Sequence, residues 1–248
     1  MTSLDPLVRL FGRPLLRLSF ALFKREIRRA PMPRDEPDGS IPGPHPERLV
    51  FIGDVLTGGY GVVTHDISTH ARTAQLVAAR RGRGVDWVAR IDPTRLADEL
   101  AVSDVLDLRE ADVAVVLLGV TDVLFLTRTD AWATALAAIT DRLRRSAGPD
   151  CEVVFVAIPP LADFWPIPLP FRQLIRWQAD RLNAATRDLV TQLPGVRYSE
   201  FPGLVGPARS RGPVSWRHLH DQWARGLTPL VIEALEERSA DGGVSATA

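Results

Sequence analysis

Short runs of β-branched and other apolar residues alternate with longer segments of helical pattern along most of the chain. Strands are predicted at 49–52, 85–89, 113–118, 153–158 and 196–198, and helices near 69–81, 94–108, 131–145, 169–193 and 219–237. The run 113–118 has no polar alternation, which is typical of a strand buried on both faces. Strands that alternate with helices favour right-handed crossovers and a parallel sheet. We therefore predict an α/β fold, a three-layer α/β/α sandwich around a mainly parallel five-stranded sheet.

The charge balance of the 248 residues excludes several classes of protein. Thirty Lys and Arg residues balance thirty Asp and Glu residues, so no overall positive field would attract nucleic acid. The one cysteine, Cys151, cannot form an internal disulfide, and nothing requires an oxidising compartment. We expect a cytoplasmic protein that does not bind nucleic acid.

The chain divides into four parts by composition. We predict a basic amphipathic helix at residues 1–30 and a Pro-rich linker at 31–47. The folded domain is expected at 48–238 and a flexible tail at 239–248. Basic residues outnumber acidic ones in the first part, which suits a helix lying on the anionic inner face of a membrane. A helix docked on the domain or on a partner fits the same pattern, and both interpretations stay open.

Ligands of such sheets bind beyond the carboxyl ends of the strands, so the residues that follow each strand are the most informative. The first predicted strand is followed by Gly53-Asp54-Val55-Leu56-Thr57, and the third by Gly119-Val120-Thr121-Asp122. His220 lies near the start of the last helix, and Arg217 precedes it by three residues.

These three blocks resemble those of the SGNH, or GDSL-type, esterase and lipase superfamily, in its actinobacterial style. The resemblance covers about residues 48–238 and implies a flavodoxin-like SGNH hydrolase fold. Family members carry Gly-Asp-Ser-Leu-Thr, Gly-x-Asn-Asp and Asp-x-x-His at these places. Here Val55 replaces the serine, Thr121 the asparagine and Arg217 the aspartate, while His220 takes the histidine position.

The resemblance implies a mechanism that these replacements oppose. The family's serine attacks an ester carbonyl, the histidine accepts its proton, and the aspartate orients the histidine. Val55 has no nucleophilic atom, and Thr121 is too short to replace an asparagine amide, a donor whose loss costs roughly 2.7–4 kcal/mol. Asp92, which falls at the position of the family's second-block glycine, would repel an oxyanion, and Arg217 would disfavour a charged His220.

Three hypotheses about function follow. In the first, the protein is a noncatalytic pseudo-hydrolase whose former cleft binds an acyl or ester ligand or a protein partner. In the second, it is an active ester hydrolase in which His220 works with a displaced nucleophile such as Thr57 or Ser215. In the third, it is a membrane-associated scaffold with a closed cleft. We expect seven residues to line the cleft: Gly53, Asp54, Val55, Asp92, Gly119, Thr121 and Asp122.

Three other features receive structural interpretations. Asp54 and Asp122 are expected to support the loops after their strands rather than to react. His65, Asp66 and His70 follow no metal-ligand spacing, and Gly58-Gly59-x-Gly61 lacks the pattern of a phosphate loop. No metal or cofactor is implied, and the aromatic stretch 159–171 is expected to form an apolar lip beside the cleft.

Overall fold

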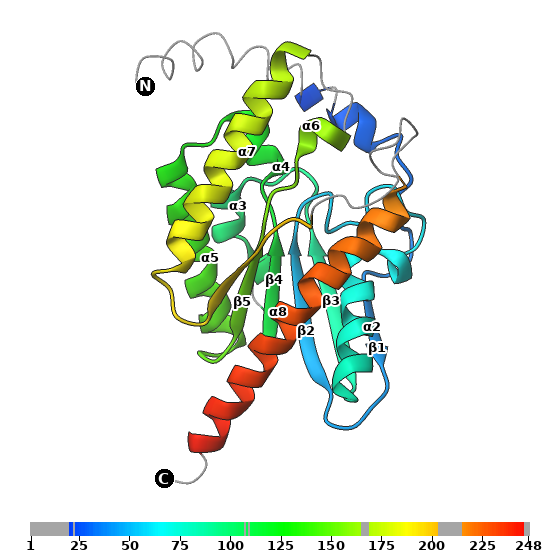
Figure 1. Ribbon diagram of the computed structural model, residues 1–248, viewed down its shortest axis with the longest axis vertical. Coiled ribbons are helices and arrows are strands. Elements are labelled where there is room, and N and C mark those ends of the chain that lie inside the picture. The colour runs from blue at the N-terminus through cyan, green and yellow to red at the C-terminus, as the bar shows by residue number, and fades with distance from the viewer. Residues whose placement is uncertain are drawn as a thin grey trace.

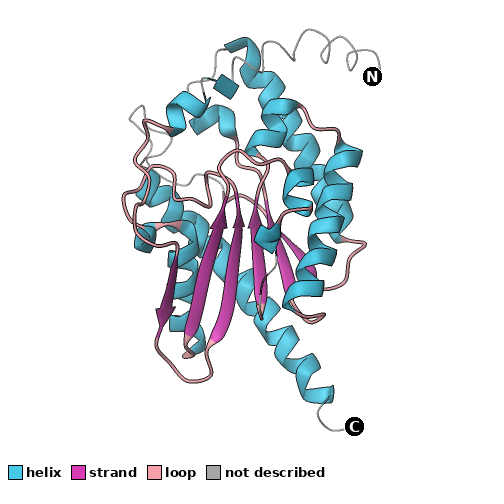
Figure 2. Cartoon of the chain, turned by 180° about the vertical axis from the view of Figure 1, so that it is seen from behind, coloured by secondary structure: helices cyan, strands magenta, loops and turns pink. Residues whose placement is uncertain are grey.

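A six-stranded sheet organises the chain. The computed structural model describes residues 20–245 except 22, 107, 109, 165–168 and 203–214. The strands are β1 (Asp38–Ile41), β2 (Glu47–Gly53), β3 (Val85–Ile91), β4 (Val113–Leu117), β5 (Glu152–Val156) and β6 (Val196–Ser199), in the spatial order β1-β3-β2-β4-β5-β6. Strands β2 to β6 are parallel, and β1 joins β3 antiparallel, with Gly39 opposite Trp87. Figure 2 shows β1 at the edge, running against its neighbours.

The helices cover both faces of the sheet, as the crossover rule requires. They are α2 (Thr69–Arg81), α3 (Ala97–Ala101), α4 (Val120–Phe125), α5 (Thr129–Ala147), α6 (Leu161–Phe164), α7 (Leu169–Val190) and α8 (Trp216–Ser245), with short 3-10 turns η1 (His65–Ile67) and η2 (Asp104–Leu106). The step from β2 to β3 runs opposite to the later steps, so right-handed crossovers put α2 on one face and α3, α5 and α7 on the other. Helix α8 packs along α2 and completes the first layer (Figure 1).

The core lies between these layers. All five residues of β4 are buried, which confirms the expectation of a strand covered on both faces. Phe51 and Phe155 are among the largest fully buried side chains of the sheet, and Trp223 of α8 is buried as well. The α/β sandwich with its mainly parallel sheet is therefore the predicted one.

Three boundaries differ from the sequence prediction. The sheet has a sixth strand because 38–41, expected within a solvated linker at 31–47, pairs with β3. A Cβ atom on Gly39 would lie 2.8 Å from the Trp87 ring, so the missing side chain lets this edge strand cross the indole. Helix α3 covers only part of the predicted 94–108, and α8 extends beyond both predicted ends, to Ser245.

The chain before β1 lies over the carboxyl ends of the central strands. Residues 20–21 and 23–27 are helical and sit above the strand tips, in blue in Figure 1. Phe23 is buried in the domain core, and the Phe20 ring lies 4.8 Å from that of Phe125 in α4. The rest of the expected amphipathic helix, residues 1–19, lies outside the described residues. None of the described helices has the length and apolarity needed to cross a membrane.

Candidate functional site

The loop after β2 holds Val55, where the resemblance places a nucleophilic serine. The whole side chain is enclosed, with 0% exposure, and it joins the main apolar core. Its methyl groups can neither attack a carbonyl nor donate a hydrogen bond. Thr57, considered as a displaced nucleophile, is also buried and donates its hydroxyl to the Leu117 carbonyl at 3.2 Å. Neither Val55 nor Thr57 is therefore an accessible nucleophile.

Asp54 ties the loop after β2 to the loop after β4. Its Oδ1 accepts the Leu56 N–H at 3.1 Å, and its Oδ2 accepts the N–H groups of Gly119 and Val120 at 3.1 and 2.9 Å. Burial raises the pKa of this carboxyl to about 6, although the three N–H donors favour its charged form. The contacts account for a buried acid at this position without a catalytic role.

Thr121, at the position of the family's asparagine, is buried in the first turn of α4. Its Oγ1 has no hydrogen-bond partner within the part of the chain that the structure describes. Gly119 precedes it with a φ of 128°, and a Cβ there would lie 2.5 Å from Ile158 Cδ1. The backbone at this point therefore requires glycine, and the Thr121 hydroxyl is a buried donor without a protein acceptor.

Asp122 supports the loops around α4. Its Oδ2 accepts the Ala97 N–H at 3.1 Å, and its Oδ1 accepts the Thr127 hydroxyl at 2.8 Å. Burial raises the pKa of Asp122 to about 7. The side chain thus joins the start of α3 to the end of α4.

Asp92 follows β3, where the resemblance places a glycine. Its side chain is about one third exposed and accepts from Arg95 Nε at 2.8 Å. Its backbone N–H donates to the Gly53 carbonyl at 3.0 Å. The ion pair with Arg95 offsets the negative charge that would oppose an oxyanion here.

His220 is enclosed, and both of its ring nitrogens are engaged. Nδ1 lies 2.7 Å from Thr69 Oγ1 and accepts the Thr69 N–H at 3.2 Å, while Nε2 lies 3.0 Å from the Tyr60 carbonyl oxygen. An acceptor at Nδ1 and a donor at Nε2 describe a neutral imidazole. Burial lowers its pKa to about 4. The ring links the start of α2 to the loop after β2.

A second hydroxyl–imidazole pair lies beside the first. Ser68 Oγ is 2.9 Å from His70 Nε2, and burial lowers the pKa of His70 to about 3. Ser68, Thr69 and His70 are each at most 1% exposed. The sequence offered no signal for the Thr69–His220 pair, because these residues are 151 positions apart, whereas Ser68 and His70 are only two apart.

The segment before β1 packs on the glycine-rich turn that follows Val55. A Cβ atom added to Gly58 would lie 3.1 Å from Met32 Cε, and one added to Gly59 would lie 2.8 Å from Pro33 Cγ. Met32 and Pro33 therefore pack against the loop after β2. The Gly61 N–H donates to the Pro31 carbonyl at 2.9 Å, and the Asp35 carboxylate accepts the His65 N–H at 2.9 and 3.1 Å. We call residues 20–35, without the undescribed residue 22, the N-terminal cover.

The first residue of α8 packs on the same loop from the other side. The Trp216 ring lies 4.6 Å from that of Tyr60, edge to face. Gly61 has a φ of 84°, and a Cβ there would lie 2.2 Å from Trp216, so a side chain at this position would collide with the indole. Trp216 and the N-terminal cover together enclose the glycine-rich turn.

The sequence profile of the GDSL-like Lipase/Acylhydrolase family matches residues 51–226. This span contains Val55, Asp92, Thr121 and His220. The chain belongs to this family.

Solved GDSL-type and related esterases share the fold. A carbohydrate acetylesterase family member from Sinorhizobium meliloti has a TM-score of 0.59 at 17% identity, over 77% of this chain and 99% of that one. The M. smegmatis aryl esterase has a TM-score of 0.59 at 16% identity, over 76% of this chain and 100% of that one. An active site mutant of a family two carbohydrate esterase from Clostridium thermocellum has a TM-score of 0.58 at 18% identity, over 79% of this chain and 66% of that one. No curated protein matches the sequence.

The third GDSL block divides between the interior and the surface. His220 is buried, whereas Ser215, Arg217 and His218 are exposed and line a surface pocket. Arg217 therefore lies in a different environment from His220. Ser215 and His218 also have the spacing of Asp-x-x-His, so the sequence contains a second register of this block, shifted by two residues.

No metal centre is present among the residues that the structure describes. Groups of three His, Cys, Asp or Glu side chains close enough to hold an ion are absent from these residues. His65 and His70 do lie together, with ring centroids 5.1 Å apart, and the Trp87 ring is 5.0 Å from that of His70. Together they form an aromatic cluster between α2 and the sheet.

Proposed function

We propose that this protein is a noncatalytic member of the GDSL-like family that acts by binding. The observation that carries the proposal is the enclosed valine at the nucleophile position, beneath the N-terminal cover. A serine-type reaction needs an accessible nucleophile and a base within hydrogen-bond reach. Val55 supplies no nucleophile, and both ring nitrogens of His220 are already hydrogen-bonded, to Thr69 and to the Tyr60 carbonyl.

The closed arrangement favours a role as an interaction protein. Six of the seven residues expected to line a cleft are buried, and the seventh, Asp92, is about one third exposed and paired with Arg95. Val55 is fully enclosed, so an acyl ligand could reach it only if the surrounding chain opened. A protein partner that contacts the closed surface requires no such change, and this supports the closed-cleft hypothesis over the open-cleft one.

The N-terminal cover also suits contact with anionic lipid. Lys24, Arg25, Arg28 and Arg29 are exposed, while Phe23 faces the core. We propose that these basic groups face the inner membrane surface while the apolar side of the helix stays docked. Removal of residues 1–30 should then abolish cosedimentation with phosphatidylserine vesicles, and unchanged cosedimentation would contradict the proposal.

A hydrolase with a displaced nucleophile is the second candidate. Its support is the Ser68–His70 pair, with Oγ and Nε2 2.9 Å apart, and the neighbouring Thr69–His220 pair. Both pairs are buried, so substrate would need an opening of the surrounding chain. Hydrolysis is therefore the measurement that separates the two candidates.

The experiment is the hydrolysis of short- and medium-chain p-nitrophenyl esters by highly purified protein. The parent, His220→Ala, His70→Ala and Val55→Ser are purified in parallel. We expect the same background rate in all four, including Val55→Ser, because a serine at this position would be enclosed and would lack a free base. Activity in the parent that disappears in either histidine variant would refute the noncatalytic proposal.

A further inference from the structure

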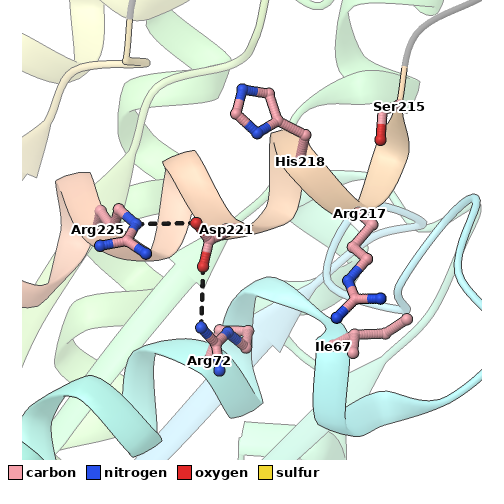
Figure 3. A pocket seen from close by; sticks show the side chains of 7 residues that line it. All are labelled: Ile67, Arg72, Ser215, Arg217, His218, Asp221 and Arg225. Atoms are coloured by element: carbon pink, nitrogen blue, oxygen red, sulfur yellow. Dashed lines mark hydrogen bonds and ion pairs between the residues drawn. The ribbon is translucent and has the colours of Figure 1, made fainter.

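A basic pocket lies between α2 and the first turns of α8. Its volume is about 390 Å³, and it is lined by Ile67, Arg72, Ser215, Arg217, His218, Asp221 and Arg225. Figure 3 shows the side chains of both helices around it. Val55, Thr121 and Asp92 do not line it, so it is separate from the enclosed site of the GDSL fold. Its volume falls within the range typical of small-molecule sites, about 300–1,000 Å³.

Two of the three pocket arginines are held in place by one carboxylate. Asp221 Oδ1 accepts from Arg72 Nη2 at 3.0 Å, and Asp221 Oδ2 accepts from Arg225 Nε at 2.8 Å (Figure 3). Arg72 Nη1 also donates to Gln75 Oε1 at 2.7 Å. Each guanidinium keeps further N–H donors beyond these bonds, because arginine has five. Asp221 thus orients two arginines without using all their donors.

The third arginine has no carboxylate of its own. Arg217 is exposed and, among the residues that the structure describes, forms no ion pair. The lining therefore contains three guanidinium groups against a single carboxylate, an excess of two positive charges. Ser215 adds a hydroxyl donor and His218 an imidazole at the same opening.

We propose that this pocket binds a small molecule through a phosphomonoester group. Such a group carries about −1.5 to −2 charges near neutral pH and three strong acceptor oxygens, which matches an excess of two positive charges and several guanidinium donors. A carboxylate has one charge and two oxygens and would leave part of the donor set unused. The phosphomonoester comes either from a soluble metabolite or from the headgroup of a phosphatidic-acid-type lipid.

Titration calorimetry with glycerol 3-phosphate tests the soluble source. Cosedimentation with vesicles containing phosphatidic acid, measured relative to phosphatidylserine vesicles of equal surface charge, tests the lipid source, because the charge-matched vesicles account for attraction to the basic N-terminal cover. The full chain is compared with Arg217→Gln and with Arg80→Gln, a control at an exposed arginine elsewhere on α2. Arg217 is exposed, so its replacement should leave the fold unchanged. Loss of charge-assisted hydrogen bonds at this position should weaken binding about tenfold or more, whereas Arg80→Gln should bind like the parent.

Three outcomes would overturn the proposal. The first is the absence of saturable binding in both arms, with glycerol 3-phosphate raised to about 10 mM, well above a millimolar dissociation constant. The second is equal binding by the parent and Arg217→Gln. The third is equal affinity for glycerate, which has the same three-carbon skeleton but carries a carboxylate in place of the phosphate. Binding in one arm that depends on Arg217 supports the site and identifies the source.

Discussion

Replacement of Phe23 by alanine should detach the N-terminal cover while the domain stays folded. Phe23 is 7% exposed and is the main apolar anchor of this helical segment in the core. Other attachments include the Gly61–Pro31 backbone hydrogen bond, the Asp35 contact to the His65 N–H, the Phe20–Phe125 ring contact and the packing of Ile27, Ala30 and Met32 on the core. None of these lies within a strand of the sheet, so their loss need not disturb the strand ladder.

The expected magnitude follows from the burial of the ring. Truncating a buried phenylalanine to alanine costs about 3–5 kcal/mol, and the lower end applies here because the cover lies at the edge of the core. If the loss falls entirely on the attachment of the cover, about 3 kcal/mol raises the population of the detached state roughly 100-fold, since each 1.4 kcal/mol is a factor of ten.

Hydrogen exchange of individual amides measures this change. The Gly61 and His65 N–H groups donate to Pro31 and Asp35 of the cover, so their exchange should accelerate by about two orders of magnitude in Phe23→Ala. The amide of Val115 in the middle of β4 exchanges only when the sheet opens, so it should remain far slower than Gly61 and His65 in both proteins. Val102→Ala, at an apolar side chain that is 74% exposed, is the matched control and should change neither.

Two results would refute the reasoning. Unchanged exchange at Gly61 and His65 would mean that Phe23 does not hold the cover. An equal opening free energy at Gly61 and Val115 in Phe23→Ala would mean that the cover opens only when the whole domain unfolds, so that it is part of the core rather than a separable cover.

Two further predictions concern buried groups. Cys151 is 2% exposed and burial raises its thiol pKa to about 11, so Ellman's reagent should react only after denaturation, and prompt reaction of the native protein would contradict this. The pKa of His220 is about 4 in the folded protein, against 6.5 in the unfolded chain. Between these pH values the unfolded chain binds a proton that the folded protein does not. The stability that neutral His220 contributes is therefore lost as the pH falls. Relative to His220→Gln, the parent should lose about 3 kcal/mol of unfolding free energy from pH 6.5 to pH 4 in urea titrations, and parallel pH profiles would disprove it.

The strand pattern predicted the fold because buried parallel strands leave a strong apolar signal. The apolar run of β4 predicts a buried strand without further information. The sequence of β1, Asp-Gly-Ser-Ile, has no apolar alternation, so its pairing with β3 could not be predicted from its residues. Residue identities at the family positions could likewise be read directly, including Val55 and Thr121. Burial at those positions could not, because it depends on how segments far apart in the sequence pack around them.

The sequence also does not show which of the two histidines, His218 or His220, is buried. A local pattern places His220 near the start of a helix but does not say which side of that helix faces inward. In the structure Trp216 and His220, one helical turn apart, face the loop after β2, whereas Arg217 and His218 face the surface pocket. Tertiary packing of α8 on α2, rather than the spacing within the block, decides which histidine is accessible.

On the proposal of a noncatalytic protein, the two faces of α8 also explain how the GDSL-type fold is kept with a valine at position 55. Asp54 satisfies three backbone N–H groups and His220 joins α2 to the loop after β2, so both stabilise the structure whether or not a reaction occurs. An apolar side chain such as Val55 suits an enclosed position better than a hydroxyl, which would need a partner there. Substitutions on the outer face, at Arg217 or His218, leave these inner contacts untouched. A ligand site on that face can therefore be altered independently of the scaffold beneath it.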